Sequence, residues 1–247
     1  MEPLKANYTV EEFNHKYTII NGDIKIPKLP SVTTIKNIIN KGNGLMIWSR
    51  REALKLAEKE ITEYWQKNGV INQPIIAECM AKADREPDRI KDEAGDLGDI
   101  VHTNINDYIL GKMPDFTPES KIGFNNFLKW LDEEKIQLFM GDTRLASLKR
   151  KFGGRADGFG LQSNDLILMD WKTSKKIYDD QAVQVGGYLV AAEEQFSIKI
   201  PKAAIVRFDK IQISVFEHKW VDVENAKACF IAALELYYAY KPAKLWI

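Results

Sequence analysis

The chain has 247 residues, 45% of them hydrophobic and 28% charged, which is ordinary for a globular protein. Its formal net charge of zero argues mildly against a general nucleic-acid binder. No apolar stretch approaches the ~20 residues that a membrane-spanning helix needs. The first residues show no secretory pattern and the chain has only two cysteines, Cys79 and Cys229, so we expect reduced thiols and a cytoplasmic location.

The first half of the chain is predicted to be mostly helical. Two short β-patterned runs around Asn21-Gly22 predict a hairpin over residues 17–26, because Asn-Gly suits a tight turn with positive φ angles. Ser31, after Pro30, is the expected N-cap of a short helix. Apolar residues at helical spacing predict helices over Leu45–Lys67, Gln73–Ala83, Pro87–Leu110 and Pro118–Glu134.

The second half changes character after Ile136. We expect three strands, a helix, two more strands and a closing helix. In order, these are Leu138–Ser147, Phe152–Leu161, Leu166–Trp171, Asp179–Glu194, Ala203–Phe208, Ile211–Phe216 and Val223–Tyr240. This order predicts an α/β fold with a mixed central sheet flanked by helices.

The expected organisation is one compact domain with two regions. Residues 1–117 would form a helical N-terminal region with a β-hairpin, serving as one wall of a substrate cleft. Residues 118–247 would form the core and the closing helix.

One acid-x-lysine tripeptide differs from the others in the chain. Asp170-Trp171-Lys172 ends the strongly apolar run Leu166–Met169, and it is therefore expected at the end of a buried strand. Alternation puts Asp170 and Lys172 on the same face of that strand. Asp157 lies on the preceding strand, and antiparallel pairing would bring it beside Asp170.

Two carboxylates that share a site repel each other unless a cation neutralises them. Oxygen ligands with room for water suit Mg²⁺ or Mn²⁺. Such an ion lowers the pKa of bound water and stabilises charge on a phosphoryl oxygen. Lys172 would orient the attacking water or stabilise the developing charge. The three residues Asp157, Asp170 and Lys172 are therefore the expected catalytic centre.

Four motifs in this order resemble those of the PD-(D/E)XK nucleases. The motifs are Gly98-Asp-Ile-Val-His102, Gly154-Arg-Ala-Asp157, Asp170-Trp-Lys172-Thr173 and Gln184-Val-Gly-Gly-Tyr188. More narrowly, they are similar to the RecB-type branch, which includes the mitochondrial genome maintenance exonuclease and the exonucleases of CRISPR adaptation. The segment 30–35 is also similar to the start of these domains, so the resemblance covers about residues 30–216.

The resemblance implies a restriction-endonuclease-like core and a metal-dependent DNA exonuclease of DNA repair or recombination, acting on DNA with single-stranded ends. His102 would join the two aspartates as a metal ligand and tilt preference toward Mn²⁺, with the backbone carbonyl of Trp171 as a further ligand. Gln184 and Tyr188, one helical turn apart, would contact the DNA backbone or the scissile phosphate.

Three further candidates each have an open alternative. Gln181 lies beside Gln184 on the same helix face, but it also fits a polar helix edge. Thr173 would hydrogen-bond the site, although a strand end needs no such role. Asp142 lies where the family often carries a metal-supporting Glu, and it is equally well explained as a turn residue.

A basic stretch without any acid is a candidate DNA path: Arg144, Lys149, Arg150, Lys151 and Arg155. Alternation puts Arg155 on the strand face of Asp157, where it would contact the substrate. Lys149–Lys151 is expected at a hairpin tip, which either steers DNA or is only a solvated surface.

Two rival functions stay open at this point. A structure-specific endonuclease would use the same core, and a covalently closed single-stranded circle would separate it from an exonuclease. A catalytically silent nucleic-acid-binding module would usually lack a metal carboxylate or the lysine, and all three residues are present. Some of these nucleases hold an iron–sulfur cluster on four cysteines, which two cysteines cannot supply, so no cluster is expected.

Overall fold

The computed structural model describes residues 3–39, 42–116, 118–208 and 216–240, and the chain divides into two compact units. Unit 1 comprises residues 1–39 and 99–247, and unit 2 comprises residues 40–98. This division differs from the expected boundary at residue 117. The end of helix α3 (Gln73–Ile109) belongs to unit 1 because Ile105 is fully buried in a core cluster with the sheet.

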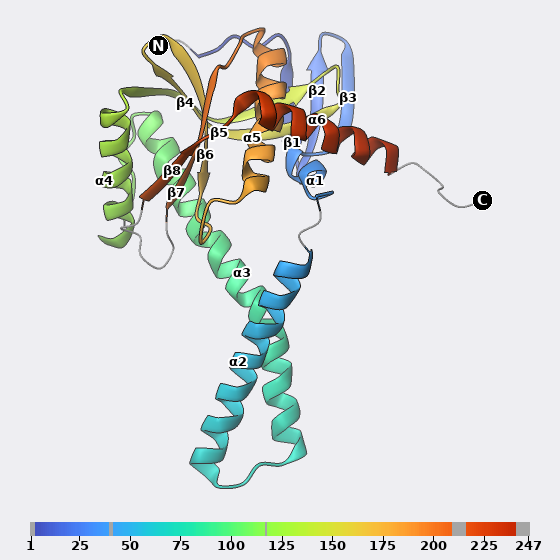
Figure 1. The fold of residues 1–247 in the computed structure, drawn as a ribbon, viewed down its shortest axis with the longest axis vertical. Coiled ribbons are helices and arrows are strands. Elements are labelled where there is room, and N and C mark those ends of the chain that lie inside the picture. Colours follow the sequence, from blue (N-terminus) through green and yellow to red (C-terminus); the bar gives the residue numbers. More distant parts are fainter. Residues whose placement is uncertain (1–2, 40–41, 117, 209–215, 241–247) are drawn as a thin grey trace, which may run out of the picture. The chain divides into compact units, whose positions relative to one another are not determined.

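The main sheet of unit 1 has five strands in the order β4-β5-β6-β7-β8 (Figure 1). These strands are β4 (Ile136–Ser147), β5 (Phe152–Gln162), β6 (Asp165–Lys172), β7 (Lys202–Phe208) and β8 (Phe216–Trp220). All neighbours pair antiparallel except β6 and β7, which are parallel and joined through helix α5 (Asp179–Phe196). The sheet is therefore mixed, and the expected α/β fold is confirmed.

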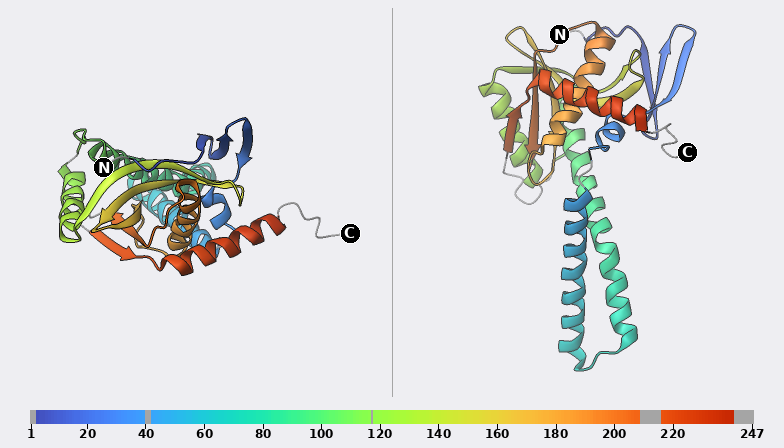
Figure 2. Two further views of the ribbon diagram at one scale, coloured as in Figure 1. Left: turned by 90° about the horizontal axis from the view of Figure 1, so that it is seen from above. Right: turned by 45° about the vertical axis from the view of Figure 1, so that its right-hand side comes forward.

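Helices cover both faces of this sheet (Figures 1 and 2). Leu168 of β6 packs in a cluster with α1 (Val32–Lys36), α5 and α6 (Val223–Tyr240). Its neighbours Ile167 and Met169 point the other way, toward α4 (Pro118–Glu133) and the end of α3. Every strand residue in the centre of β6 is therefore buried, as the apolar run predicts.

Two glycines fix how closely α5 and α6 cross. A Cβ on Gly186 would lie 2.1 Å from the carbonyl oxygen of Ala226, and one on Gly187 would lie 2.6 Å from the ring of Phe230. Larger residues would push α6 away from α5. The Gly-Gly pair between Gln184 and Tyr188 thus has a packing role of its own.

A second, three-stranded sheet in unit 1 contains the expected hairpin. It consists of β1 (Thr9–Phe13), β2 (Lys16–Asn21) and β3 (Ile24–Leu29), all antiparallel. The hairpin is confirmed, but its turn lies one residue later than expected. Asn21 pairs with Ile24, so Gly22 and Asp23 are the central residues, and of these only Gly22 has a positive φ, at +57°. Strand β1 was not expected, because it is an edge strand without a buried residue.

The short helix α1 follows this sheet directly. Ser31 is its N-cap, as expected, and the Oγ accepts a hydrogen bond from the Thr34 amide at 3.0 Å. Ser31 also forms a parallel bridge with Gly153 at the start of β5. The helix is therefore tied to the main sheet at its N-cap.

Unit 2 consists of helix α2 (Gly42–Asn68) and the first part of α3, which run antiparallel (Figure 2). The two helices expected at Gln73–Ala83 and Pro87–Leu110 are one continuous helix with Pro87 inside it, so the predicted break is wrong. A proline removes one backbone donor, but its φ is close to the helical value, and here the helix continues through it.

Two further expectations concern the ends of elements. The strand expected at Ile211–Phe216 lies outside the described residues except for Phe216, the first residue of β8. The closing helix is confirmed as α6. Among the described helices, none combines the length and the apolar character needed to cross a bilayer.

Candidate active site

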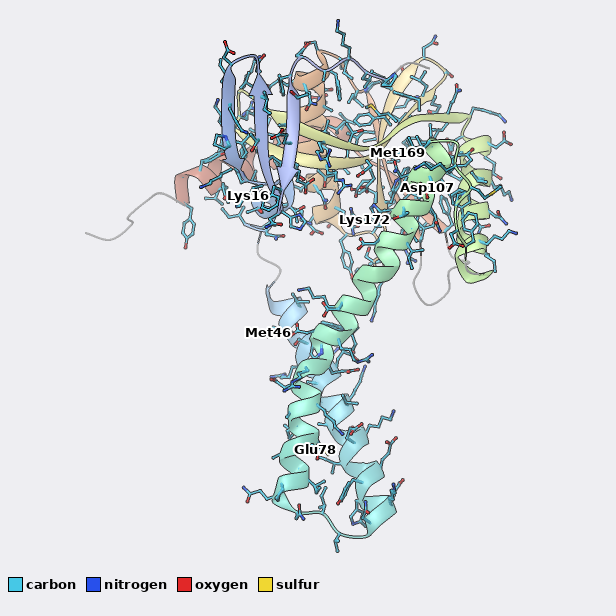
Figure 3. All side chains as sticks on the ribbon, turned by 180° about the vertical axis from the view of Figure 1, so that it is seen from behind. Lys16, Met46, Glu78, Asp107, Met169 and Lys172 are labelled. Atoms are coloured by element: carbon cyan, nitrogen blue, oxygen red, sulfur yellow. The ribbon has the colours of Figure 1, made fainter. Side chains whose placement is uncertain are left out.

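The candidate site lies in unit 1, at the end of β6 (Figure 3, where Met169 and Lys172 are labelled). Trp171 packs edge-on against Phe127 of α4, with ring centroids 5.2 Å apart. Because side chains alternate along a strand, this contact directs Asp170 and Lys172 to the opposite face. Their ion pair confirms that the two side chains lie together.

Asp157 lies where β5 separates from β6. The pairing of the two strands ends at Gly158 and Met169. Beyond this last pair, the backbone amide of Trp171 donates to Asp157 Oδ2 at 2.7 Å. The Asp157 side chain thus replaces the backbone carbonyl that a paired strand would supply. The expected antiparallel pairing thus brings Asp157 to the end of β6.

His102 approaches this carboxylate from α3. Its Nδ1 lies 3.3 Å from Asp157 Oδ1, and its side chain is 39% exposed. Burial lowers the pKa of His102, but the Asp157 carboxylate outweighs this and leaves the pKa above its ordinary value. Burial raises the pKa of Asp157, but His102, the Lys172 ammonium and the Trp171 amide together hold it below its usual range.

Asp170 is the most deeply buried carboxylate of the site, with 1% of its surface exposed. Neither of its oxygens receives a well-formed hydrogen bond from the described residues, although the Lys172 ammonium pairs with Oδ2. Burial raises the pKa of Asp170 to about 7, and Asp157 adds to the rise while Lys172 opposes it. A carboxylate in this position is stabilised by a proton or by a cation.

The residues present suit a divalent ion. Among the described residues, no three His, Cys, Asp or Glu side chains gather closely enough to enclose an ion by themselves. Mg²⁺ sites commonly need only one or two carboxylates, with water and substrate phosphate completing the shell. Asp157 and Asp170 supply such a pair, and His102 adds a nitrogen at its side.

Lys172 is largely buried beside the two carboxylates, with 17% of its side chain exposed. Burial lowers the pKa of Lys172, but the charges of Asp170 and Asp157 outweigh it and raise the pKa above its ordinary value. The ammonium therefore stays charged and can donate hydrogen bonds into the site.

Gln184 and Tyr188 lie one turn apart on α5 and are bonded to each other. The Gln184 amide donates to the Tyr188 hydroxyl at 2.6 Å. Burial raises the pKa of Tyr188 well above its usual value, and the charges of Asp170 and Asp157 add to this rise. The carboxylates act on the phenol, so Tyr188 belongs to the electrostatic surroundings of the site.

Gly154, which begins the Gly154–Asp157 motif, makes room for Tyr188. A Cβ on Gly154 would lie 2.7 Å from the Tyr188 ring. The ring thus packs directly against the backbone of β5. Gly154 is explained by this close approach.

Sequence reasoning missed one residue near the site, Lys36 at the end of α1. Its ammonium lies 3.3 Å from Asp180 Oδ2 and 3.4 Å from Gln184 Oε1, and its side chain is 13% exposed. A lysine at the end of a short helix carries no sequence signal for such a position. Only the folding of α1 onto α5 reveals it.

Three expected site residues have partners within the protein. Arg155 binds Asp142 through two hydrogen bonds, one of them 2.5 Å from Nη2 to Oδ2. Gln181 is buried, and its amide accepts from the Tyr178 backbone at 2.8 Å and donates to the Ser174 hydroxyl at 3.1 Å. Asp142 therefore lies against Arg155, and Gln181 holds the segment between β6 and α5. Their roles toward a metal or substrate stay predictions.

The remaining candidates lie further along the same elements. Thr173 is half-buried and follows β6 directly. Lys149, Arg150 and Lys151 form the exposed tip between β4 and β5, as expected. Glu194, near the end of α5, accepts from the Lys149 amide at 2.9 Å and anchors this tip. Arg144 reaches Glu12 of β1, with 3.9 Å between Nε and Oε2.

No protein-family model matches the chain, and no curated protein matches it. Solved structures do match, at 14% identity. The alkaline exonuclease LHK-Exo from Laribacter hongkongensis has a TM-score of 0.30, covering 56% of this chain and 81% of that one. LHK-Exo in complex with dAMP also has a TM-score of 0.30, covering 59% and 85%. The structure of SSO0001 has a TM-score of 0.32, covering 73% and 84%. Likenesses this low in identity and TM-score do not bear on the function of this chain.

Proposed function

We propose that the protein is a divalent-metal-dependent DNA exonuclease of the RecB-type branch of the PD-(D/E)XK superfamily, acting in the cytoplasm on DNA with single-stranded ends. The observation that carries this proposal is the carboxylate of Asp170, which is buried without a well-formed hydrogen bond and lies beside a second carboxylate and a lysine. Structural carboxylates in protein interiors are normally hydrogen-bonded. A site that gathers such groups is better explained by the binding of a cation.

Asp157, Asp170 and His102 would hold Mg²⁺ or Mn²⁺, with the Trp171 carbonyl as a further ligand. When bound, the ion neutralises the two carboxylates, lowers the pKa of a nearby water and stabilises charge on a phosphoryl oxygen. The Trp171 amide keeps Asp157 in place through its 2.7 Å hydrogen bond.

The chain's own residues would position the substrate and stabilise charge. The Lys172 ammonium would orient the attacking water or stabilise the negative charge that develops on the phosphate. Gln184 and Tyr188 would hold the phosphate, and Arg155 and Thr173 would contact the DNA strand. Basic side chains along the β4–β5 hairpin would extend the surface that contacts the DNA strand.

The direct test is hydrolysis of end-labelled single- and double-stranded DNA and RNA in Mg²⁺, Mn²⁺ or EDTA. We expect mononucleotides or short products to accumulate from the ends of DNA, and EDTA to abolish them. A covalently closed single-stranded circle should stay intact. Cleavage of the circle would instead establish an endonuclease on the same core.

Variants then connect the activity to the site. Asp170→Asn and Asp157→Asn should each abolish hydrolysis, because each removes a negative ligand without changing volume. Lys172→Ala should keep metal binding and lower turnover by about 10²–10³, the usual cost of one charge-stabilising donor. Asp165→Asn is the matched control, since Asp165 begins the same strand and pairs with Lys202 at 2.9 Å on the surface. Full activity of Asp170→Asn in Mg²⁺ would refute the proposal.

A further inference from the structure

Lys36 connects a remote part of the chain to the candidate active site. It is 148 residues from Gln184 in sequence, yet its ammonium lies 3.4 Å from Gln184 Oε1. The same ammonium pairs with Asp180 Oδ2 at 3.3 Å. The side chain is 13% exposed, so the charge is held between α1 and the first turns of α5.

The chemistry of an ammonium group fixes the direction of the hydrogen bonds that follow. Lysine has three donors and no acceptor, whereas a glutamine amide has an acceptor at one end and donors at the other. Lys36 can therefore bind only Oε1 of Gln184, which turns the NH₂ group toward Tyr188. That NH₂ group donates to the Tyr188 hydroxyl at 2.6 Å.

The direction of this bond decides what Tyr188 can do. Its hydroxyl oxygen accepts from Gln184, so its own hydrogen is directed to a different partner. At neutral pH a phenol with an ordinary pKa near 10 carries that hydrogen. The ring packs directly against Gly154, so its position is set by β5. The hydrogen bond from Gln184 and the packing of the ring against Gly154 together orient the Tyr188 hydroxyl as a donor.

We propose that Lys36 is a positioning residue, which orients Gln184 so that Tyr188 presents its O–H as a hydrogen-bond donor to an anionic oxygen of the substrate phosphate. This inference rests on the proposed nuclease function, since it names the groups that would meet the phosphate. Without Lys36, the Gln184 amide can turn over. Its carbonyl then accepts the Tyr188 hydrogen and removes the donor from the site.

A purely structural role of Lys36 would be to tie α1 to α5 through Asp180. A matched control for that structural role lies near the C-terminal end of α5. Lys227 of α6 is 14% exposed and pairs with Glu193 of α5 at 3.1 Å. It also pairs with Glu224 at 2.8 Å. Lys36→Met and Lys227→Met remove equally buried ion pairs from α5, and only the first touches Gln184.

The test compares the steady-state kinetics of these variants on a labelled DNA end. Lys36→Met should lower kcat by about 10- to 100-fold, the range for one hydrogen bond to a charged group, with a smaller change in KM. Lys227→Met should keep the kcat of the unmodified protein. Lys36→Arg should restore most of the rate, because a guanidinium also has only donors. Equal losses in both Met variants would overturn the proposal.

A double-mutant cycle shows whether Lys36 acts through Tyr188. Tyr188→Phe removes the donor itself, so adding Lys36→Met to Tyr188→Phe should cause little further loss of kcat. If the two losses multiply, Lys36 acts independently of Tyr188 and the proposal is wrong.

A measurement without substrate separates this inference from the proposed function. The side-chain amide hydrogens of Gln184, assigned in NMR spectra by their loss in Gln184→Glu, should exchange slowly in the unmodified protein and faster in Lys36→Met. A protein that hydrolyses no nucleic acid yet shows this change would refute the nuclease proposal and keep the orientation of Gln184 by Lys36. Unchanged exchange in Lys36→Met would overturn the positioning role, whatever the activity.

Discussion

At the scale of single residues, Asp170 has a property that can be measured without any substrate. Burial raises its pKa to about 7, far above the ordinary value of about 3.9. Between these two values the folded protein holds a proton that the unfolded chain has already lost. The contribution of Asp170 to the free energy of unfolding is therefore largest below about pH 4, the pKa in the unfolded chain, and is lost as pH rises to about 7.

We predict that in EDTA the free energy of unfolding of the unmodified protein falls, relative to that of Asp170→Asn, as pH rises from about 5 to about 8. Urea denaturation followed by circular dichroism measures this difference. Excess Mn²⁺ should reduce the fall, because a bound cation stabilises the ionised carboxylate. A difference that stays constant with pH would mean that Asp170 titrates as an ordinary surface acid.

His102 is the residue for which metal preference gives the clearest prediction. An imidazole nitrogen suits Mn²⁺ better than Mg²⁺. His102→Ala should therefore weaken Mn²⁺ binding by about tenfold or more and Mg²⁺ binding by less, as measured by calorimetry. His218 of β8 is a suitable control, since it packs on Trp130 with ring centroids 5.2 Å apart and its Nε2 lies 4.0 Å from Glu134 Oε1. Unchanged metal affinities, with a large loss of thermal stability, would indicate a structural histidine.

At the scale of elements, the β4–β5 hairpin carries basic side chains on a tip whose backbone is held by the rest of unit 1. Glu194 binds the Lys149 amide, and the Tyr238 hydroxyl donates to the Lys151 carbonyl. Glu194 is about 15 Å along α5 from Gln184, at 1.5 Å per residue. This exceeds the Debye length of about 10 Å at 0.1 M salt. The tip can therefore attract DNA without affecting the chemical step.

We predict that replacing the three tip residues, by Lys149→Ser, Arg150→Ser and Lys151→Asn, flattens the slope of log affinity against log salt by about two units, at ~0.7 per lost phosphate contact. Asparagine is used at position 151 because Lys151 has φ +60°. Turnover at saturating DNA should stay within about twofold, whereas Arg155→Ala should lower it. Filter binding of single-stranded DNA at several salt concentrations measures the slope. An unaltered slope would assign the tip to ordinary solvated surface.

At the scale of the whole molecule, unit 1 has a core of its own. Its three hydrophobic clusters contain no residue of unit 2. Among the described residues of unit 2, the buried hydrophobic side chains are small: Ala57, Cys79 and Ala83. The folding of unit 1 should therefore not depend on α2.

Replacing residues 44–96 by a flexible Gly-Ser linker of about 20 residues, which spans about 25 Å, should leave unit 1 folded and able to bind Mn²⁺. Near-ultraviolet circular dichroism and a Mn²⁺-dependent rise in melting temperature check this. Hydrolysis of a small phosphodiester should be retained, because all the residues of the candidate site lie in unit 1. Loss of the folded state would contradict the independence of unit 1.

Local pattern determined much of this protein, because alternation and helical spacing act over a few residues. The apolar run before Asp170 predicted a buried strand that ends in an acid and a lysine, and Asn21-Gly22 predicted the hairpin. Strand β1 forms by antiparallel pairing with β2, and α3 continues through Pro87, and the local signals for these two features were weak or contrary. The tertiary structure alone decided that Asp170 is left without a well-formed hydrogen bond and that Lys36 reaches Gln184. The burial of Asp170 and the contact between Lys36 and Gln184, 148 residues apart, depend on how the helices pack on the sheet. No short segment of sequence contains that information.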